Sequence, residues 1–142
     1  LVTVNTPRAQ GAVGFTNGKS VALDDVTISI ANDFAVVVVS ALEGDSIRDA
    51  KRLLVSTSAK AQWTGMEFDE ERGVVTKSGR PPFLMEPVTG TVTIKQDKPT
   101  TVYRLSSSGK RLGKVVTAKT AQGTTFDLRT ANECMHYELV RD

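Results

Sequence analysis

The sequence predicts an all-β fold, an antiparallel β-sandwich of jelly-roll or immunoglobulin-like type with about ten to twelve short strands. Three observations predict it. The 18 Val and 17 Thr residues make up about a quarter of the 142 residues, and such β-branched side chains suit a pleated surface. Short apolar runs are separated by turn signals about every 8–12 residues. No segment sustains the apolar period of a long amphipathic helix.

The first third of the chain holds the clearest strand and turn signals. Asn17-Gly18 accepts the positive φ angles of a tight turn, so we expect a hairpin between Gly11–Phe15 and Lys19–Leu23. Val26–Ile30 alternates strictly and predicts a half-exposed strand. Ala35–Leu42 contains four consecutive valines, a pattern typical of a central strand covered on both faces.

The next segment combines a helix signal with a strand signal. Ser46-Ile47-Arg48-Asp49 resembles a capping box, which predicts one or two helical turns. From Arg52 to Trp63 the residues alternate as in a single extended strand, and one face of that strand would carry Trp63 in line with Leu53 and Val55.

The second half continues in short strands joined by turns. Asp69–Arg72 predicts an acidic turn between strands at Gly65–Asp69 and Gly73–Lys77. Arg80-Pro81-Pro82 predicts a rigid stretch. The remaining expected strands are Phe83–Glu86, Thr89–Lys95, Thr100–Leu105, Lys114–Lys119, Thr124–Leu128 and Met135–Val140.

Charge, length and composition exclude several classes of protein. The formal net charge is +2, so we expect neither a nucleic-acid partner nor a membrane surface as partner. No apolar run approaches the roughly 18 residues of a membrane span. The length suits one domain, residues 1–142. Because the chain begins at Leu1 without an initiator Met or a leader, we expect it to be part of a longer polypeptide.

The residues that carry metal or nucleophile chemistry are scarce. One His136 and one Cys134 share the last segment, which does not suit a zinc site or a Ser-His-Asp set. We therefore expect no catalytic residue, no metal site and no cofactor, although a structural calcium stays open through Asp24-Asp25, Asn32-Asp33 or Asp69–Glu71. These acidic groups are more typical of solvated turns, as is the basic cluster around Lys110, Arg111 and Lys114.

Carbohydrate binding is the function that the sequence leaves most open. Such binding needs aromatic platforms for sugar rings and polar side chains for their hydroxyls. Trp63 and Tyr103 are the candidate platforms, and Gln62, Glu67 and Arg80 are candidate hydroxyl contacts. The alternative interpretation is that both aromatic residues belong to the core or its edge.

The order of several segments resembles β-sandwich domains near the C-terminal end of large bacterial glycoside hydrolases and related secreted polysaccharide-degrading proteins. The segments that carry the resemblance are Val2–Phe15, with its Thr-Pro-Arg-x-Gln-Gly run, Leu23–Ile28, Phe34–Ile47, Arg52–Val55, Glu86–Val92 and Tyr137–Val140.

The resemblance implies a non-catalytic accessory module of an extracellular or periplasmic enzyme. Such a module either binds a polysaccharide or oligosaccharide, or is a structural domain that packs on the catalytic domain of the same polypeptide and has no ligand. In an excised module, Arg8 and Gln10 would be candidates for a contact with the missing part.

Overall fold

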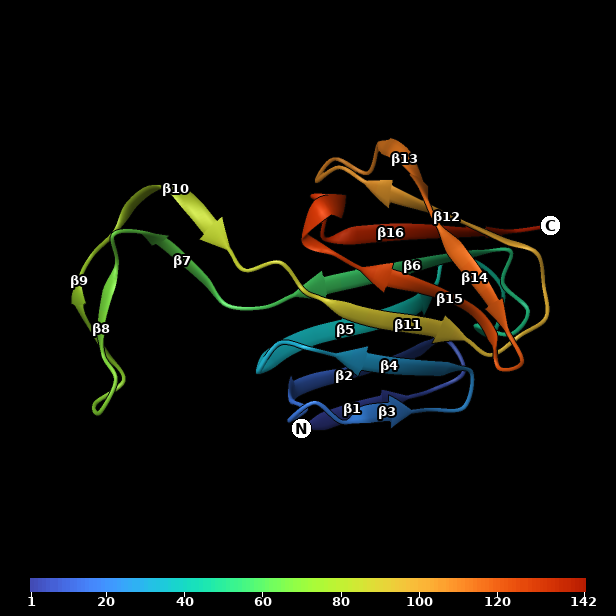
Figure 1. Cartoon of the computed structure of the whole chain (residues 1–142), viewed down its shortest axis with the longest axis horizontal. Coiled ribbons are helices and arrows are strands. Elements are labelled where there is room, and N and C mark those ends of the chain that lie inside the picture. Colours follow the sequence, from blue (N-terminus) through green and yellow to red (C-terminus); the bar gives the residue numbers. More distant parts are fainter.

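The computed structural model describes all residues from Leu1 to Asp142, and two antiparallel sheets pack face to face in it as a β-sandwich (Figure 1). This confirms the predicted fold class. The seven-stranded sheet has the order β1-β2-β5-β6-β16-β12-β13. Its strands are β1 (Val2–Asn5), β2 (Ala9–Phe15), β5 (Phe34–Ala41), β6 (Arg52–Ser58), β16 (His136–Arg141), β12 (Thr100–Leu105) and β13 (Arg111–Val115).

The second layer is a five-stranded sheet of order β14-β15-β11-β4-β3. Its strands are β14 (Thr117–Thr120), β15 (Gly123–Leu128), β11 (Gly90–Ile94), β4 (Val26–Ile30) and β3 (Ser20–Ala22). A short 3₁₀ turn, η1 (Thr130–Asn132), precedes β16. No helix in the structure is both long and apolar enough to cross a membrane.

Four further strands leave the sandwich as a two-part hairpin, which we call the arm (residues 60–86). The proximal ribbon pairs β7 (Ala61–Thr64) with β10 (Arg80–Met85), and the distal ribbon pairs β8 (Glu67–Asp69) with β9 (Val74–Lys77). In Figure 1 the arm projects from the end of the sandwich opposite the C-terminus. These strands bring the total to sixteen, above the ten to twelve expected.

The core lies between the two sheets and contains 22 buried apolar residues. Alternation along the strands supplies them, because successive side chains point to opposite faces. β4 and β5 both alternate between buried and half-buried residues, as predicted for Val26–Ile30. β5 is an interior strand, but its outer residues Val36 and Val38 are only half buried. The expectation of cover on both faces is therefore wrong within this chain, since no element packs on that side.

The predicted turn at Asn17-Gly18 is confirmed, but the prediction that the strands on its two sides pair with each other is wrong. Asn17 and Gly18 have φ of 51° and 71°, and the Lys19 amide donates to the Thr16 carbonyl at 3.0 Å. β2 nevertheless pairs with β1 and β5, whereas β3 pairs with β4 in the other sheet. The turn carries the chain from one layer to the other, so the strands on its two sides pair within different sheets.

Two predicted strands are each divided. Arg52–Trp63 separates into β6 and β7, which belong to different sheets, because the chain leaves the sandwich after the buried Ala59. Lys114–Lys119 separates into β13 and β14, one in each layer, on either side of Val116, which is 91% exposed. Trp63 therefore does not continue the buried face of Leu53.

Two local predictions concern turns. The Ser46 hydroxyl donates to Asp49 Oδ2 at 2.8 Å and accepts from the Asp49 amide at 3.1 Å. The Ala50 amide donates to the Ser46 carbonyl at 3.0 Å, which closes a single turn. No helix forms there, so the helical part of the prediction is wrong. In the acidic turn, Asp69 Oδ1 accepts from the amides of Glu71 and Arg72 at 3.1 Å each.

Candidate functional site

The arm is the part of the molecule whose surface the sandwich does not explain. None of its residues is buried. It nevertheless carries seven of the thirteen large apolar side chains that the chain exposes. They are Trp63, Phe68, Val74, Val75, Phe83, Leu84 and Met85.

The proximal ribbon presents one apolar face. Trp63 lies opposite Phe83 and Ala61 lies opposite Met85 in the register of β7 and β10, so the four side chains share a face. The rings of Trp63 and Phe83 meet edge to face with centroids 5.0 Å apart. Trp63 remains 41% exposed and Phe83 50% exposed, so this pair stiffens the ribbon without burying it.

The candidate hydroxyl contacts do not gather around Trp63. Gln62 and Thr64 flank Trp63 on β7 and lie on the opposite face, and Arg80 pairs with Thr64 in register. Glu67 belongs to the distal ribbon, where its Oε1 accepts from Lys77 Nζ at 2.8 Å. The arm therefore contains four of the five predicted site residues, but only Trp63 lies on the apolar face.

Tyr103 lies on β12, in the sandwich, and is not part of the arm. The guanidinium of Arg111 stacks over its ring, 4.2 Å from the centroid, and donates from Nε to Glu138 Oε2 at 2.6 Å. Glu138 also accepts from Arg52 at 2.7 Å. Hydrogen bonds from Arg111 and then Arg52 hold the pKa of the buried Glu138 below its usual range, against the effect of its burial. One face of the Tyr103 ring is thus occupied by a cation.

The tip of the arm is acidic. Asp69 caps the turn, and neither Glu70 nor Glu71 makes a side-chain ion pair within the chain. Gly73 at the end of this turn has φ of 65°, in the region that favours glycine. The arm therefore combines an apolar proximal face with two unpaired carboxylates at its far end.

The base of the arm is closed by one backbone contact. The Glu86 amide donates to the Lys60 carbonyl at 2.8 Å. Next to this point, Met85, Cys134 and Met135 line a shallow hollow between the arm and the segment that leads into β16. The arm thus enters and leaves the sandwich at a single place.

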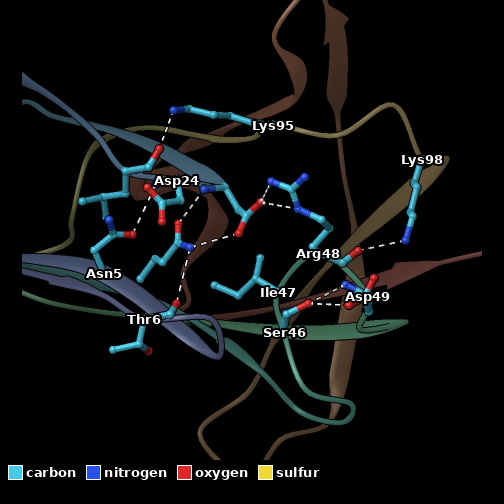
Figure 2. A network of polar contacts seen from close by, with 12 residues as sticks. Asn5, Thr6, Asp24, Ser46, Ile47, Arg48, Asp49, Lys95 and Lys98 are labelled. Carbon is cyan, nitrogen blue, oxygen red and sulfur yellow. Dashed lines mark hydrogen bonds and ion pairs between the residues drawn. The ribbon is translucent and has the colours of Figure 1, made fainter.

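The opposite end of the sandwich holds a polar network, shown in Figure 2. Gln10 is 1% exposed; its Nε2 donates to Asp25 Oδ2 at 3.1 Å and its Oε1 accepts from the Asp25 amide at 2.8 Å. Arg48 donates to the other oxygen of Asp25 at 2.8 Å. The expectation that Gln10 contacts a missing part is therefore wrong, since its partners lie within this chain. Arg8 is exposed.

The side chains with nucleophile or metal chemistry do not converge. His136 Nδ1 lies 3.3 Å from Ser56 Oγ, with no carboxylate bonded to the ring. Cys134 is a half-buried free thiol. No group of three His, Cys, Asp or Glu side chains gathers around a common point. Of the candidate calcium ligands, Asp25 is engaged with Arg48 and Gln10, and Asn32 donates to Glu86 Oε1 at 2.9 Å.

Comparison with known proteins identifies no relative: no protein-family model, no curated protein and no solved structure matches the chain. The arm itself is the feature that sequence reasoning missed. Its one available signal is the sequence after Trp63, where apolar residues stop alternating strictly and Pro81-Pro82 interrupts the strand pattern.

Proposed function

We propose that this chain is a non-catalytic accessory module of a secreted polysaccharide-degrading enzyme and that it docks onto a protein surface through the arm. The observation that carries the proposal is the arm's composition: no buried residue, and seven exposed large apolar side chains. Of these, Trp63, Phe83 and Met85 share one face of the proximal ribbon, and contiguous exposed apolar surface marks interaction sites in soluble proteins.

The expected low stability of the arm by itself also favours a partner. An isolated two-stranded hairpin is marginally stable in water and needs a further layer for independent stability. The Trp63–Phe83 contact contributes on the order of 0.5–1.5 kcal/mol beyond its area, which is small beside the ordering cost of some 25 residues. A partner that covers the apolar face supplies the missing burial.

A glycan is the second candidate target, favoured by the 41% exposure of Trp63. A sugar site requires hydroxyl-binding groups around the platform, and Gln62 and Arg80 lie on the other face of the ribbon. Phe83, Met85 and Ala61 surround Trp63 instead. An apolar neighbourhood of this kind suits a protein surface better than a polyol.

The experiment compares the intact chain with a variant in which a short Gly-Ser turn replaces residues 61–85. Both are examined by affinity electrophoresis over a panel of polysaccharides. Both are also tested for complex formation by size-exclusion chromatography with light scattering, alone at high concentration and with the catalytic domain of the same polypeptide produced separately.

We expect the intact chain to form a complex with a second copy of itself or with the catalytic domain, and we expect this complex to be absent in the variant without the arm. We expect removal of the arm to leave the mobility of the chain in every polysaccharide gel unchanged. Retardation that is lost in Trp63→Ala would overturn the protein proposal in favour of a sugar site. Absence of any arm-dependent complex would overturn it as well. Gln62→Ala, on the opposite face of β7, is the matched control.

A further inference from the structure

A second uncovered apolar surface lies over β2 and β5, on the outer face of the seven-stranded sheet, whereas β16 and β12 carry the polar residues Glu138 and Tyr103 on the same face. Val13 pairs with Val36, and Val38 packs over Gly11, where a Cβ would meet Val38 Cγ2 at 2.9 Å. At the same edge of the face, the rings of Phe15 and Phe34 meet at 5.3 Å. No element of the chain packs on this side of β2 and β5.

The outer face of the five-stranded sheet is of the opposite kind. Thr27, Thr93 and Thr125 face outward on neighbouring strands, with Thr93 and Thr125 joined by their hydroxyls at 2.8 Å. Ser29 and Thr91 form a second polar row. An antiparallel sheet commonly has one solvated polar face. The apolar patch over β2 and β5 therefore needs a different explanation.

We propose that the arm of one copy of this chain lies across the outer face of the seven-stranded sheet of a second copy. This inference rests on the proposed function, because it names the protein surface to which the arm docks. It accounts for both uncovered apolar surfaces with one contact.

The dimensions of the two surfaces agree. β5 and β13 are four strand spacings apart in the sheet, or about 19 Å at roughly 4.8 Å per spacing. Trp63 and Glu70 are seven residues apart, at most about 23 Å at roughly 3.3 Å per residue. The apolar face of the proximal ribbon can therefore cover Val36 and Val38 while the acidic tip reaches β13.

The charges agree as well. Lys114 lies opposite Tyr103 on the outer face of β13, and Lys110 comes just before this strand. Neither ammonium makes an ion pair within the chain. They face the place where the docked arm would bring Glu70 and Glu71, which also lack partners. Complementary charges at a rim fix orientation and register.

The area is that of a small specific contact. Trp63, Phe83 and Met85 lie on the apolar face of the proximal ribbon, whereas Leu84 lies on the other face, opposite Gln62. Phe68 and Val75 pair on the distal ribbon. At roughly 100 Å² each, these five side chains present at most about 500 Å². With the matching area on the acceptor sheet, one docked arm covers about 1,000 Å², the lower limit for a specific interface.

The test measures mass in solution by light scattering and sedimentation equilibrium of the whole chain at 25 °C. We expect twice the monomer mass, and a monomer after removal of residues 61–85. Phe68→Ser on the distal ribbon and Val36→Lys on the acceptor face should each weaken the dimer at least tenfold. Thr91→Lys, on the outer face of the other sheet, is the matched control and should leave the dimer unchanged.

Charge reversal tests the register. Glu70→Lys with Glu71→Lys in one copy should weaken association several-fold, and Lys110→Glu with Lys114→Glu in the other copy should restore it. Circular dichroism and thermal unfolding show that each variant is folded. A chain that stays monomeric, while its arm binds the catalytic domain, would overturn this inference and leave the proposed function standing. A dimer that survives Val36→Lys or removal of the arm would also overturn it.

Discussion

The sandwich and the arm are built from the same kind of antiparallel strand pairs, yet they hold their shape in different ways. The sandwich encloses 22 buried apolar residues between two layers, whereas the arm is a single layer that buries none. Backbone pairing is common to both regions, so pairing alone does not account for the difference. A second layer makes strand pairs independently stable, and the arm has no such layer within the chain.

The largest difference between the sandwich and the arm is expected when a core residue is truncated and the free energy of unfolding is measured. Phe126 is 2% exposed and its ring lies 5.4 Å from that of Tyr137. Phe126→Ala should lower the free energy of unfolding by about 3–5 kcal/mol, measured by urea denaturation. Replacement of residues 61–85 by a short turn should change it by less than about 1 kcal/mol, since no core contact is lost. A loss as large as that of Phe126→Ala would show that the arm belongs to the cooperative unit.

The second-largest loss in the free energy of unfolding is expected in the polar network at the far end of the sandwich. Asp25 binds Gln10 and Arg48, and its charge opposes the lowering of the Arg141 pKa by burial. Asp25→Ala should cost about 2–3 kcal/mol, because it leaves buried donors without acceptors. Asp24→Ala, at the exposed neighbouring position, is the control. Equal urea midpoints for the two variants would contradict the structural role of the network.

Glu138 makes the stability of the sandwich dependent on pH in the acid range. Its pKa is lower in the folded chain than in the unfolded one, first because of Arg111. The carboxylate therefore contributes stability above its unfolded pKa of about 4.3. That stability is lost as pH falls through the folded value. Glu138→Gln should cost about 1–2 kcal/mol at pH 7, and the difference from wild type should disappear at strongly acidic pH. A difference between the two proteins that persists at strongly acidic pH would contradict this role of the Glu138 carboxylate.

Tyr137 gives a smaller alkaline effect. Burial raises its pKa to about 12, above the value of about 10 in an unfolded chain. Its contribution to stability is present below the unfolded value and declines as pH rises through the folded value. Tyr137→Phe also loses the 3.2 Å contact with Asn132 Nδ2, at a cost of about 0.5–1.5 kcal/mol near neutral pH. Unfolding followed from pH 7 to pH 11 should show a steeper decline for wild type than for the variant.

The smallest change in the free energy of unfolding is expected for a substitution in the arm. Trp63→Ala should change the free energy of unfolding by less than about 0.5 kcal/mol, because the side chain contacts no core residue. Hydrogen exchange should instead be faster at the amides of β7 and β10 in the variant, while the core strands keep their protection. Slower exchange, or a change confined to the sandwich, would refute the assignment of Trp63 to the arm's own packing.

Local chemistry was predictable from the sequence, and the choice of partners was not. Asn17-Gly18 and Asp69–Arg72 form the turns expected of them, because the backbone angles and side-chain contacts involve neighbours along the chain. Whether two successive strands pair with each other or enter different sheets depends on how the two layers pack, and the strands on either side of Asn17-Gly18 enter different sheets. The alternation from Leu53 to Trp63 is unbroken in the sequence, which gives no sign that burial ends at Ala59.

The candidate site shows the same limit. Trp63 stands at the end of the expected strand, where burial should fade, and it is 41% exposed. Gln62 adjoins Trp63 in the sequence, but period-two alternation places it on the other face. Phe83 is twenty residues away and becomes its neighbour only through the register of β7 with β10.

The single contact between Lys60 and Glu86 at the foot of the arm has a further consequence. The 25 residues between them form an insertion whose two ends meet, so its length and content can change while the strand order of the sandwich stays the same. Long insertions cost little extra loop-closure entropy when their ends are already adjacent. The position between β6 and β11 is therefore a graft site, at which evolution or design can exchange one recognition element for another on an unchanged scaffold.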